Sequence, residues 1–72
     1  MKEIIAKRLK RLRGNQSAIK VASDLGISVS ALRMYECAQR VPKDDIKARI
    51  ARYYGVSIEQ LFFDREEHET LS

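Results

Sequence analysis

The apolar residues between Asp24 and Glu36 recur at helical spacing, but a single helix cannot carry all of them. In this stretch, DLGISVSALRMYE, the pattern is interrupted at Gly26 and again at Ser28. Glycine readily adopts the left-handed conformation that ends many helices, and serine accepts hydrogen bonds from the free N–H groups at a helix start. The stretch therefore predicts two short helices joined by a very tight turn.

Helical periodicity covers nearly all of the remaining chain, with Gly14 and Gly55 as further stop residues. Ser17 is placed to cap a second helix, and Ser57 and Gln60 have the spacing of a capping box. No strand pattern or repeat is present. The sequence predicts an all-α, compact five-helix domain over residues 1–63, followed by an acidic, flexible tail over residues 64–72. The predicted helices are Lys2 to Arg13, Ala18 to Leu25, Val29 to Ala38, Asp44 to Tyr54, and a short fifth helix in SIEQLFF. The fifth helix is expected to hold Ile58, Leu61 and Phe62 against the core.

Length and composition limit the kind of protein this can be. A chain of 72 residues with 44% hydrophobic content is long enough for one small domain and leaves little room for a deep cleft. No apolar run approaches the roughly 20 residues that a membrane span needs. Cys37 is the only cysteine and cannot form an internal disulfide, and the N-terminus lacks a secretory pattern. We therefore expect a soluble, cytoplasmic protein without membrane contact.

The charge is unevenly distributed along the chain. Residues 1–63 contain 13 Lys or Arg against 6 Asp or Glu, whereas residues 64–72 contain 1 against 4. A basic body attracts nucleic acid, because binding to phosphates releases counterions. A basic surface that only keeps the protein in solution explains the charge equally well. Charge alone leaves both interpretations open.

The sequence argues against an enzyme. His68 is the only histidine and lies in the polar tail, and Cys37 has no histidine nearby. Asp44 and Asp45 are better explained as the start of a helix, where the helix dipole favours acidic side chains. No metal-ligand spacing, phosphate-binding glycine loop or catalytic triad is visible. We expect no enzymatic activity, no metal and no cofactor.

Two segments carry a resemblance to a known family. VASDLGISVSALRMYECAQRVP resembles the helix-turn-helix of lambda-repressor, Cro and Xre-type DNA-binding regulators, and IARYYGVSIEQLF resembles the segment that closes these domains. Together they cover about residues 4 to 63. The resemblance implies a lambda-repressor-like DNA-binding domain whose second and third helices form the helix-turn-helix, with the third helix in the major groove.

Helical geometry independently gives the third helix two different faces. Leu32 and Tyr35 point toward one side, which is expected to pack on the core. An arc of roughly 140° on the other side holds the expected base-contacting residues, which are Val29, Ser30, Arg33 and Met34. Arginine pairs with guanine, serine bonds to several bases, and apolar groups pack on the thymine methyl. The alternatives are a salt bridge or phosphate contact for Arg33, and coverage of the core edge for Val29 and Met34. For Met34, contact with a partner protein is a further alternative.

The resemblance also implies contacts to the DNA backbone and several structural roles. A glutamine that contacts phosphate usually begins helix 2 of the family, but Ala18 stands there, so Gln16 or Ser17 is expected to substitute. The family's glycine after the Tyr-Glu pair is replaced by Ala38, so the third helix is expected to run longer or to turn differently. The residues expected at the DNA backbone are Ser17, Ser28, Gln39, Arg40 and Lys43. For Gln39, Arg40 and Lys43, the alternative is simple exposure to solvent.

Four further residues, Glu36, Arg13, Ala22 and Gly26, are expected to hold the motif together. In the family, the glutamate at the position of Glu36 pairs with an arginine of the first helix. The helical phase of the apolar residues favours Arg13 as its partner here, whereas a match to the family pattern without gaps favours Arg11. Ala22 leaves room for close helix approach, and Gly26 permits the turn.

These observations predict a sequence-specific, double-stranded DNA-binding transcriptional regulator. We expect a repressor that binds a palindromic operator as a homodimer, resembling a Cro-type phage or plasmid regulator. The apolar run of Leu61, Phe62 and Phe63 is the expected dimer interface. The alternative is an antitoxin or protein-interaction module, which binds a partner protein through Phe62, Phe63 and the tail and regulates its own operon.

Overall fold

The computed structural model describes residues 2–63, so the acidic tail predicted for residues 64–72 lies outside the described residues. The five helices are α1 (Lys2–Arg13), α2 (Ala18–Leu25), α3 (Val29–Glu36), α4 (Asp44–Tyr54) and α5 (Ile58–Phe62). No strand occurs within residues 2–63. The predicted all-α, five-helix fold is confirmed. None of the helices in the described part has the length and apolar character needed to cross a membrane.

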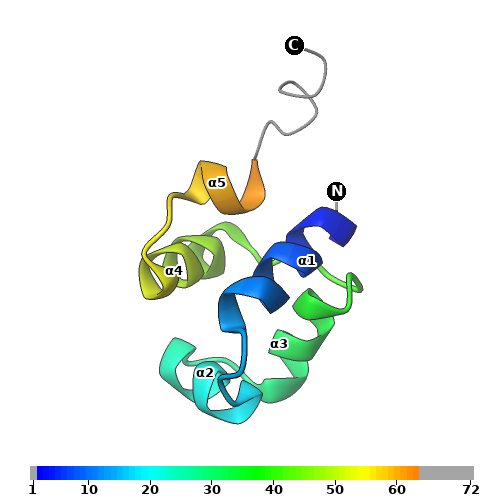
Figure 1. The fold of residues 1–72 in the computed structure, drawn as a ribbon, viewed down its shortest axis with the longest axis vertical. Coiled ribbons are helices and arrows are strands. Elements are labelled where there is room, and N and C mark those ends of the chain that lie inside the picture. Colours follow the sequence, from blue (N-terminus) through cyan, green and yellow to red (C-terminus); the bar gives the residue numbers. More distant parts are fainter. Residues whose placement is uncertain (1, 64–72) are drawn as a thin grey trace.

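The helices pack around α1, which lies between α3 on one side and the α4–α5 pair on the other (Figure 1). α1 contacts both α3 and α5, whereas α2 contacts α3 and α4. Every helix contributes at least one side chain that is less than 2% exposed; these include Leu9, Leu25, Leu32, Ile50 and Phe62. Complete burial of such a side chain contributes about 1.5–3 kcal/mol. This shared core fixes the helix-turn-helix relative to the rest of the domain.

The end of α3 differs from the prediction. The helix was expected to reach Ala38, but it ends at Glu36, and Ala38 has a φ of 63°. A residue in this left-handed conformation cannot continue a right-handed helix. α3 ends in a turn instead, in which the Gln39 N–H donates to the carbonyl of Met34 at 2.9 Å. Ala38 thus makes the turn for which the family commonly uses glycine.

The short helix α5 closes the fold over the core. The Ser57 hydroxyl and the Gln60 side chain form the predicted capping box. Leu61 and Phe62 are only 2% and 1% exposed, so both belong to the core of this chain and are not free to face a partner. Their burial confirms the core packing that was predicted for this helix. It also corrects their assignment to the dimer interface, because α5 turns its apolar side toward α1 and α4. Phe63 is the one residue of this run that is exposed, at 47%.

Candidate nucleic-acid interface

The turn between α2 and α3 is held by backbone and side-chain hydrogen bonds at both ends. Gly26 has a φ of 74°, and the Ile27 N–H donates to the carbonyl of Ala22 at 3.0 Å. Ser28 begins α3, where its hydroxyl oxygen accepts from the Ala31 N–H at 3.0 Å. Ala22 is 2% exposed, so a larger side chain has no space there. These contacts set the direction in which α3 leaves α2.

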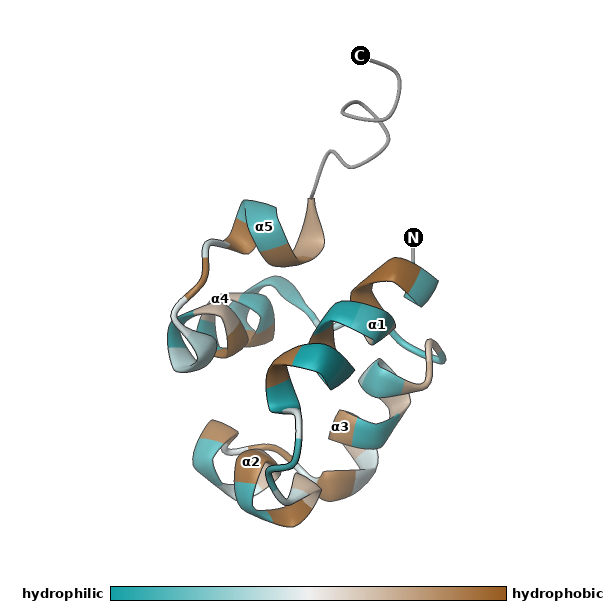
Figure 2. Ribbon diagram, in the orientation of Figure 1, coloured by the Kyte–Doolittle hydropathy of each residue, from teal (hydrophilic) through white to brown (hydrophobic). Residues whose placement is uncertain are grey.

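α3 has a buried side and an outward side, as its amphipathic sequence predicts. Leu32 and Tyr35 are 1% and 9% exposed and pack in the core. Hydrophobic and hydrophilic residues alternate along this helix (Figure 2). Ser30 and Arg33 are exposed, whereas Val29 and Met34 are half-buried. Val29 also packs against the core, so it is shared between the interior and the outward surface.

The segment that follows α3 carries further cations. Gln39, Arg40 and Lys43 are exposed. The N–H groups of Gln39 and Arg40 both donate to the Met34 carbonyl, at 2.9 and 3.3 Å, which keeps the start of this segment beside the end of α3. Within residues 2–63, the side chains of Arg33, Arg40 and Lys43 form no ion pair. Their positive charges therefore remain available to an external anion.

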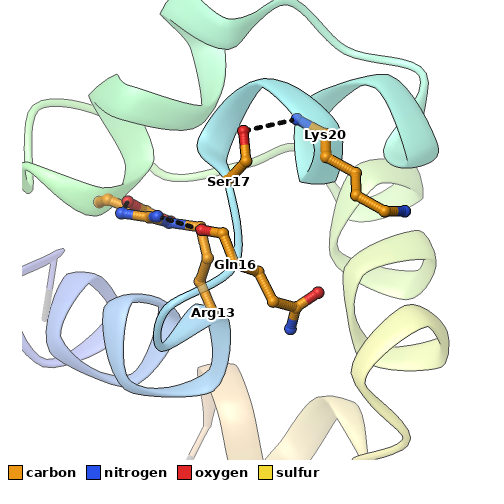
Figure 3. Close-up of polar contacts among 5 residues, drawn as sticks. Arg13, Gln16, Ser17 and Lys20 are labelled. Atoms are coloured by element: carbon orange, nitrogen blue, oxygen red, sulfur yellow. Dashed lines mark hydrogen bonds and ion pairs between the residues drawn. The ribbon is translucent and has the colours of Figure 1, made fainter.

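Ser17 and Ser28, both expected at the DNA backbone, act as helix caps. The Ser17 hydroxyl oxygen accepts from the Lys20 N–H at 3.3 Å, as Figure 3 shows. Both serines are exposed. A serine hydroxyl has one proton to donate besides its acceptor lone pairs. Each cap can thus keep its helix bond and still donate to a phosphate oxygen.

Arg13 joins three segments of the motif. Its Nε and Nη2 donate to the two carboxylate oxygens of Glu36, at 2.8 and 3.0 Å. Its Nη1 donates to the Gln16 carbonyl at 2.7 Å (Figure 3). Arg13 is therefore the partner of Glu36, whereas Arg11 is exposed. The hydrogen bond to Glu36, together with its negative charge, raises the pKa of Arg13.

The charges of Glu36 and Arg13 both affect the pKa of Tyr54. Its hydroxyl is buried and finds no hydrogen-bond partner within the described part of the chain. Burial, and to a smaller extent the negative charge of Glu36, raises the pKa of Tyr54 to about 12. The neutral phenol is thus the form that the fold favours.

Two contacts from α4 to α2 were not predicted from the sequence. The Arg49 Nη1 donates to the Leu25 carbonyl at 2.8 Å, and the Tyr53 hydroxyl donates to the Asp24 carboxylate at 2.8 Å. Lys20 also donates to Asp24 at 2.9 Å, and these bonds from Lys20 and then Tyr53 lower the pKa of Asp24. The partners are 24 and 29 residues apart in sequence. The one available signal was that Arg49 and Tyr53 are four residues apart and thus share a helix face.

The residues described offer no group of three or more His, Cys, Asp or Glu side chains that could hold a metal ion. Cys37 is exposed at the end of α3.

The outward side of α3 and the following segment present hydrogen-bond donors, cations and two half-buried apolar side chains. This combination suits the phosphates and base edges of DNA.

Comparison with known proteins identifies the family. A family model described as Helix-turn-helix, of the Cro, Xre and lambda-repressor type, matches residues 5–61. No curated protein and no solved structure is similar enough to the chain to count as a match. The matched segment runs from α1 to α5 and includes the whole α2–turn–α3 unit. The chain belongs to the helix-turn-helix family of the Cro, Xre and lambda-repressor type, whose members are DNA-binding regulators.

Proposed function

We propose that this protein is a sequence-specific repressor that works in the cytoplasm and places α3 in the major groove of a palindromic operator. The observation that carries the proposal is the division of α3 into two faces. Leu32 and Tyr35 anchor the helix in the core, while Ser30 and Arg33 are exposed on the outward side. Such a helix can enter the groove without disturbing the fold.

The outward side chains have distinct roles in this proposal. Arg33 forms a bidentate pair with a guanine, and Ser30 bonds to a neighbouring base edge. Met34 and the exposed part of Val29 pack on thymine methyl groups. Ser17, Ser28, Gln39, Arg40 and Lys43 bind the sugar-phosphate backbone and fix the orientation of the protein on the duplex.

A dimer follows from the small size of the contact surface. α3 has only eight residues, so one copy touches a short stretch of base pairs. Helix-turn-helix proteins commonly bind as dimers to two half-sites about one helical turn apart. We assign the dimer contact to the region of Phe63, an apolar side chain that the fold leaves 47% exposed. Repression then results from occupation of the promoter DNA.

The test is selection of bound fragments from random duplexes, followed by affinity measurements over a range of salt concentrations. The proposal expects a palindromic consensus and two copies per site. It also expects log affinity to fall with log salt by about 0.9 for each phosphate neutralised. Transcription from a promoter that contains the selected site should decrease. Binding without sequence preference, or affinity that is nearly independent of salt, would contradict the proposal.

A further inference from the structure

α4 holds the last residues of α2 at two adjacent points. Arg49 and Tyr53 lie one helical turn apart on α4, and they bind Leu25 and Asp24, which are consecutive on α2. The next residue is Gly26, where the helix-turn-helix turn begins. We call these two contacts the turn clamp. It lies on the α2 side of the turn.

The Arg49 contact meets a specific need of the backbone. The last carbonyls of a helix lack partners within the helix. The Gly26 N–H donates to the carbonyls of Ala22 and Ser23, which leaves the Leu25 carbonyl to Arg49. A positive charge is also favourable at a helix C-terminus. A Cβ at position 26 would lie 3.4 Å from Arg49 Nη1, so the glycine leaves the guanidinium close to the turn.

The other end of α3 is held separately, by the ion pair between Arg13 and Glu36. The helix is therefore supported near its start through the turn clamp and at its last residue through α1. Loss of the clamp would leave the start of α3 held only by the turn bonds and by its packing on the core, while its end keeps the ion pair to α1. Val29, Ser30 and Arg33 would then shift relative to the groove, although none of them is changed.

We propose that Arg49 and Tyr53 are positioning residues for DNA recognition, which set the angle of α3 by holding the end of α2. This inference rests on the proposed function. It assigns no DNA contact to either side chain. Their removal is therefore expected to reduce the discrimination between operator and unrelated DNA more than it reduces general affinity for DNA.

Three variants test the clamp, and a fourth serves as control. Arg49→Ala removes the donor to Leu25, Arg49→Lys keeps a charged donor, and Tyr53→Phe removes only one hydroxyl. Arg52→Ala is the matched control, because Arg52 is an exposed arginine on the same helix whose side chain forms no hydrogen bond or ion pair within residues 2–63. Binding to the selected operator and to an unrelated duplex is measured at several salt concentrations. Circular dichroism first identifies a temperature at which every variant is folded, and binding is measured at that temperature.

The proposal expects Arg49→Ala to lower the operator-to-unrelated affinity ratio about fivefold with an unchanged salt slope. Tyr53→Phe should lower the ratio less, and Arg49→Lys should restore most of it. Arg52→Ala should leave the ratio as in the wild type. An equal loss on both duplexes with a smaller salt slope would make Arg49 a phosphate contact. Unchanged affinities of the folded variants would make the clamp purely structural. Either result overturns the proposal, whereas a wild-type protein without sequence preference overturns the proposed function itself.

Discussion

The guanidinium of Arg13 on α1 and the carboxylate of Glu36 on α3 face each other with two hydrogen bonds, of 2.8 and 3.0 Å. The Glu36 side chain is 5% exposed and that of Arg13 is 23% exposed. A buried carboxylate is costly unless it is paired and hydrogen-bonded. Arg13 meets that need, and its additional bond to the Gln16 carbonyl fixes the connection that leads into α2.

Replacement of Arg13 should therefore strongly destabilise the protein. Arg13→Met keeps much of the apolar stem but leaves Glu36 buried without its partner, which should cost about 3 kcal/mol of unfolding free energy. Arg11→Met is the control, because Arg11 is exposed, and its cost should stay within about 0.5 kcal/mol. Urea unfolding at neutral pH measures both.

The double variant Arg13→Met/Glu36→Met separates a lost charge partner from lost packing. Replacement of both members by apolar residues of similar size often restores stability. We expect the double variant to be more stable than Arg13→Met alone. A double variant that is no more stable than Arg13→Met would contradict this explanation.

The sequence predicted most helix boundaries because local signals mark them. Ser17 and Ser28 cap α2 and α3, and Gly26 and Gly55 end α2 and α4 in the left-handed conformation. The end of α3 was missed by two residues, because alanine seldom adopts the left-handed conformation of Ala38. Local propensity favours alanine within a helix, so it did not place the end of α3 before Ala38.

The candidate site was predictable where it depends on one helix and less so where it depends on packing between helices. The helical phase alone assigned Leu32 to the buried side of α3 and Arg33 to its outward side. The predicted packing of Leu61 and Phe62 on the core is confirmed. The sequence did not separate this role from the expected dimer interface, since an apolar run fits an interior and an interface equally well. Arg49 and Tyr53 escaped notice because their partners on α2 become neighbours only in the folded chain.

Ala38→Gly should stabilise the protein. Relief of the left-handed strain at a φ of 63° exceeds the greater unfolded-state freedom of glycine, with a net gain of about 0.5–1 kcal/mol. Ala48→Gly within α4 is the matched control and should destabilise by about 1 kcal/mol. Thermal and urea unfolding report both changes. A loss of stability from Ala38→Gly similar to that of the control would show that Ala38 is not strained.

Stability should decline in alkaline solution because of Tyr54. Its pKa is raised from the ordinary value of 10.0 to about 12, chiefly by burial. Between these values the unfolded state loses the phenolic proton and the folded state keeps it, so the unfolded state is favoured. The contribution of Tyr54 is thus complete below pH 10 and is lost as the pH rises toward about 12. Tyr54→Phe should flatten this decline in denaturant unfolding measured from pH 8 to 11. Equal slopes for both proteins would contradict the assignment.

Phe63→Ser should weaken dimerisation without unfolding the chain. The side chain is 47% exposed, so little core packing is lost. If Phe63 lies in the dimer contact, the dimer dissociation constant should rise about tenfold or more. Ile19→Ser is the control, since Ile19 is 69% exposed on α2 and lies outside the proposed contact. Sedimentation with and without operator DNA measures the effect. A wild-type monomer at all concentrations, bound as one copy per site, would exclude the dimer.

The central claim is that α3 recognises base sequence while the segment after it holds the DNA backbone. Arg33 is exposed on the outward side of α3, and Lys43 is exposed just before α4. The most direct test compares Arg33→Ala and Lys43→Ala on the selected operator, on its single-base variants and on an unrelated duplex. Arg33→Ala should cost about 1–3 kcal/mol on the operator and relax the preference at one position. Lys43→Ala should weaken binding to all duplexes alike and reduce the salt slope by about one contact. An equal loss from Arg33→Ala on every duplex would contradict the claim and make Arg33 a phosphate contact.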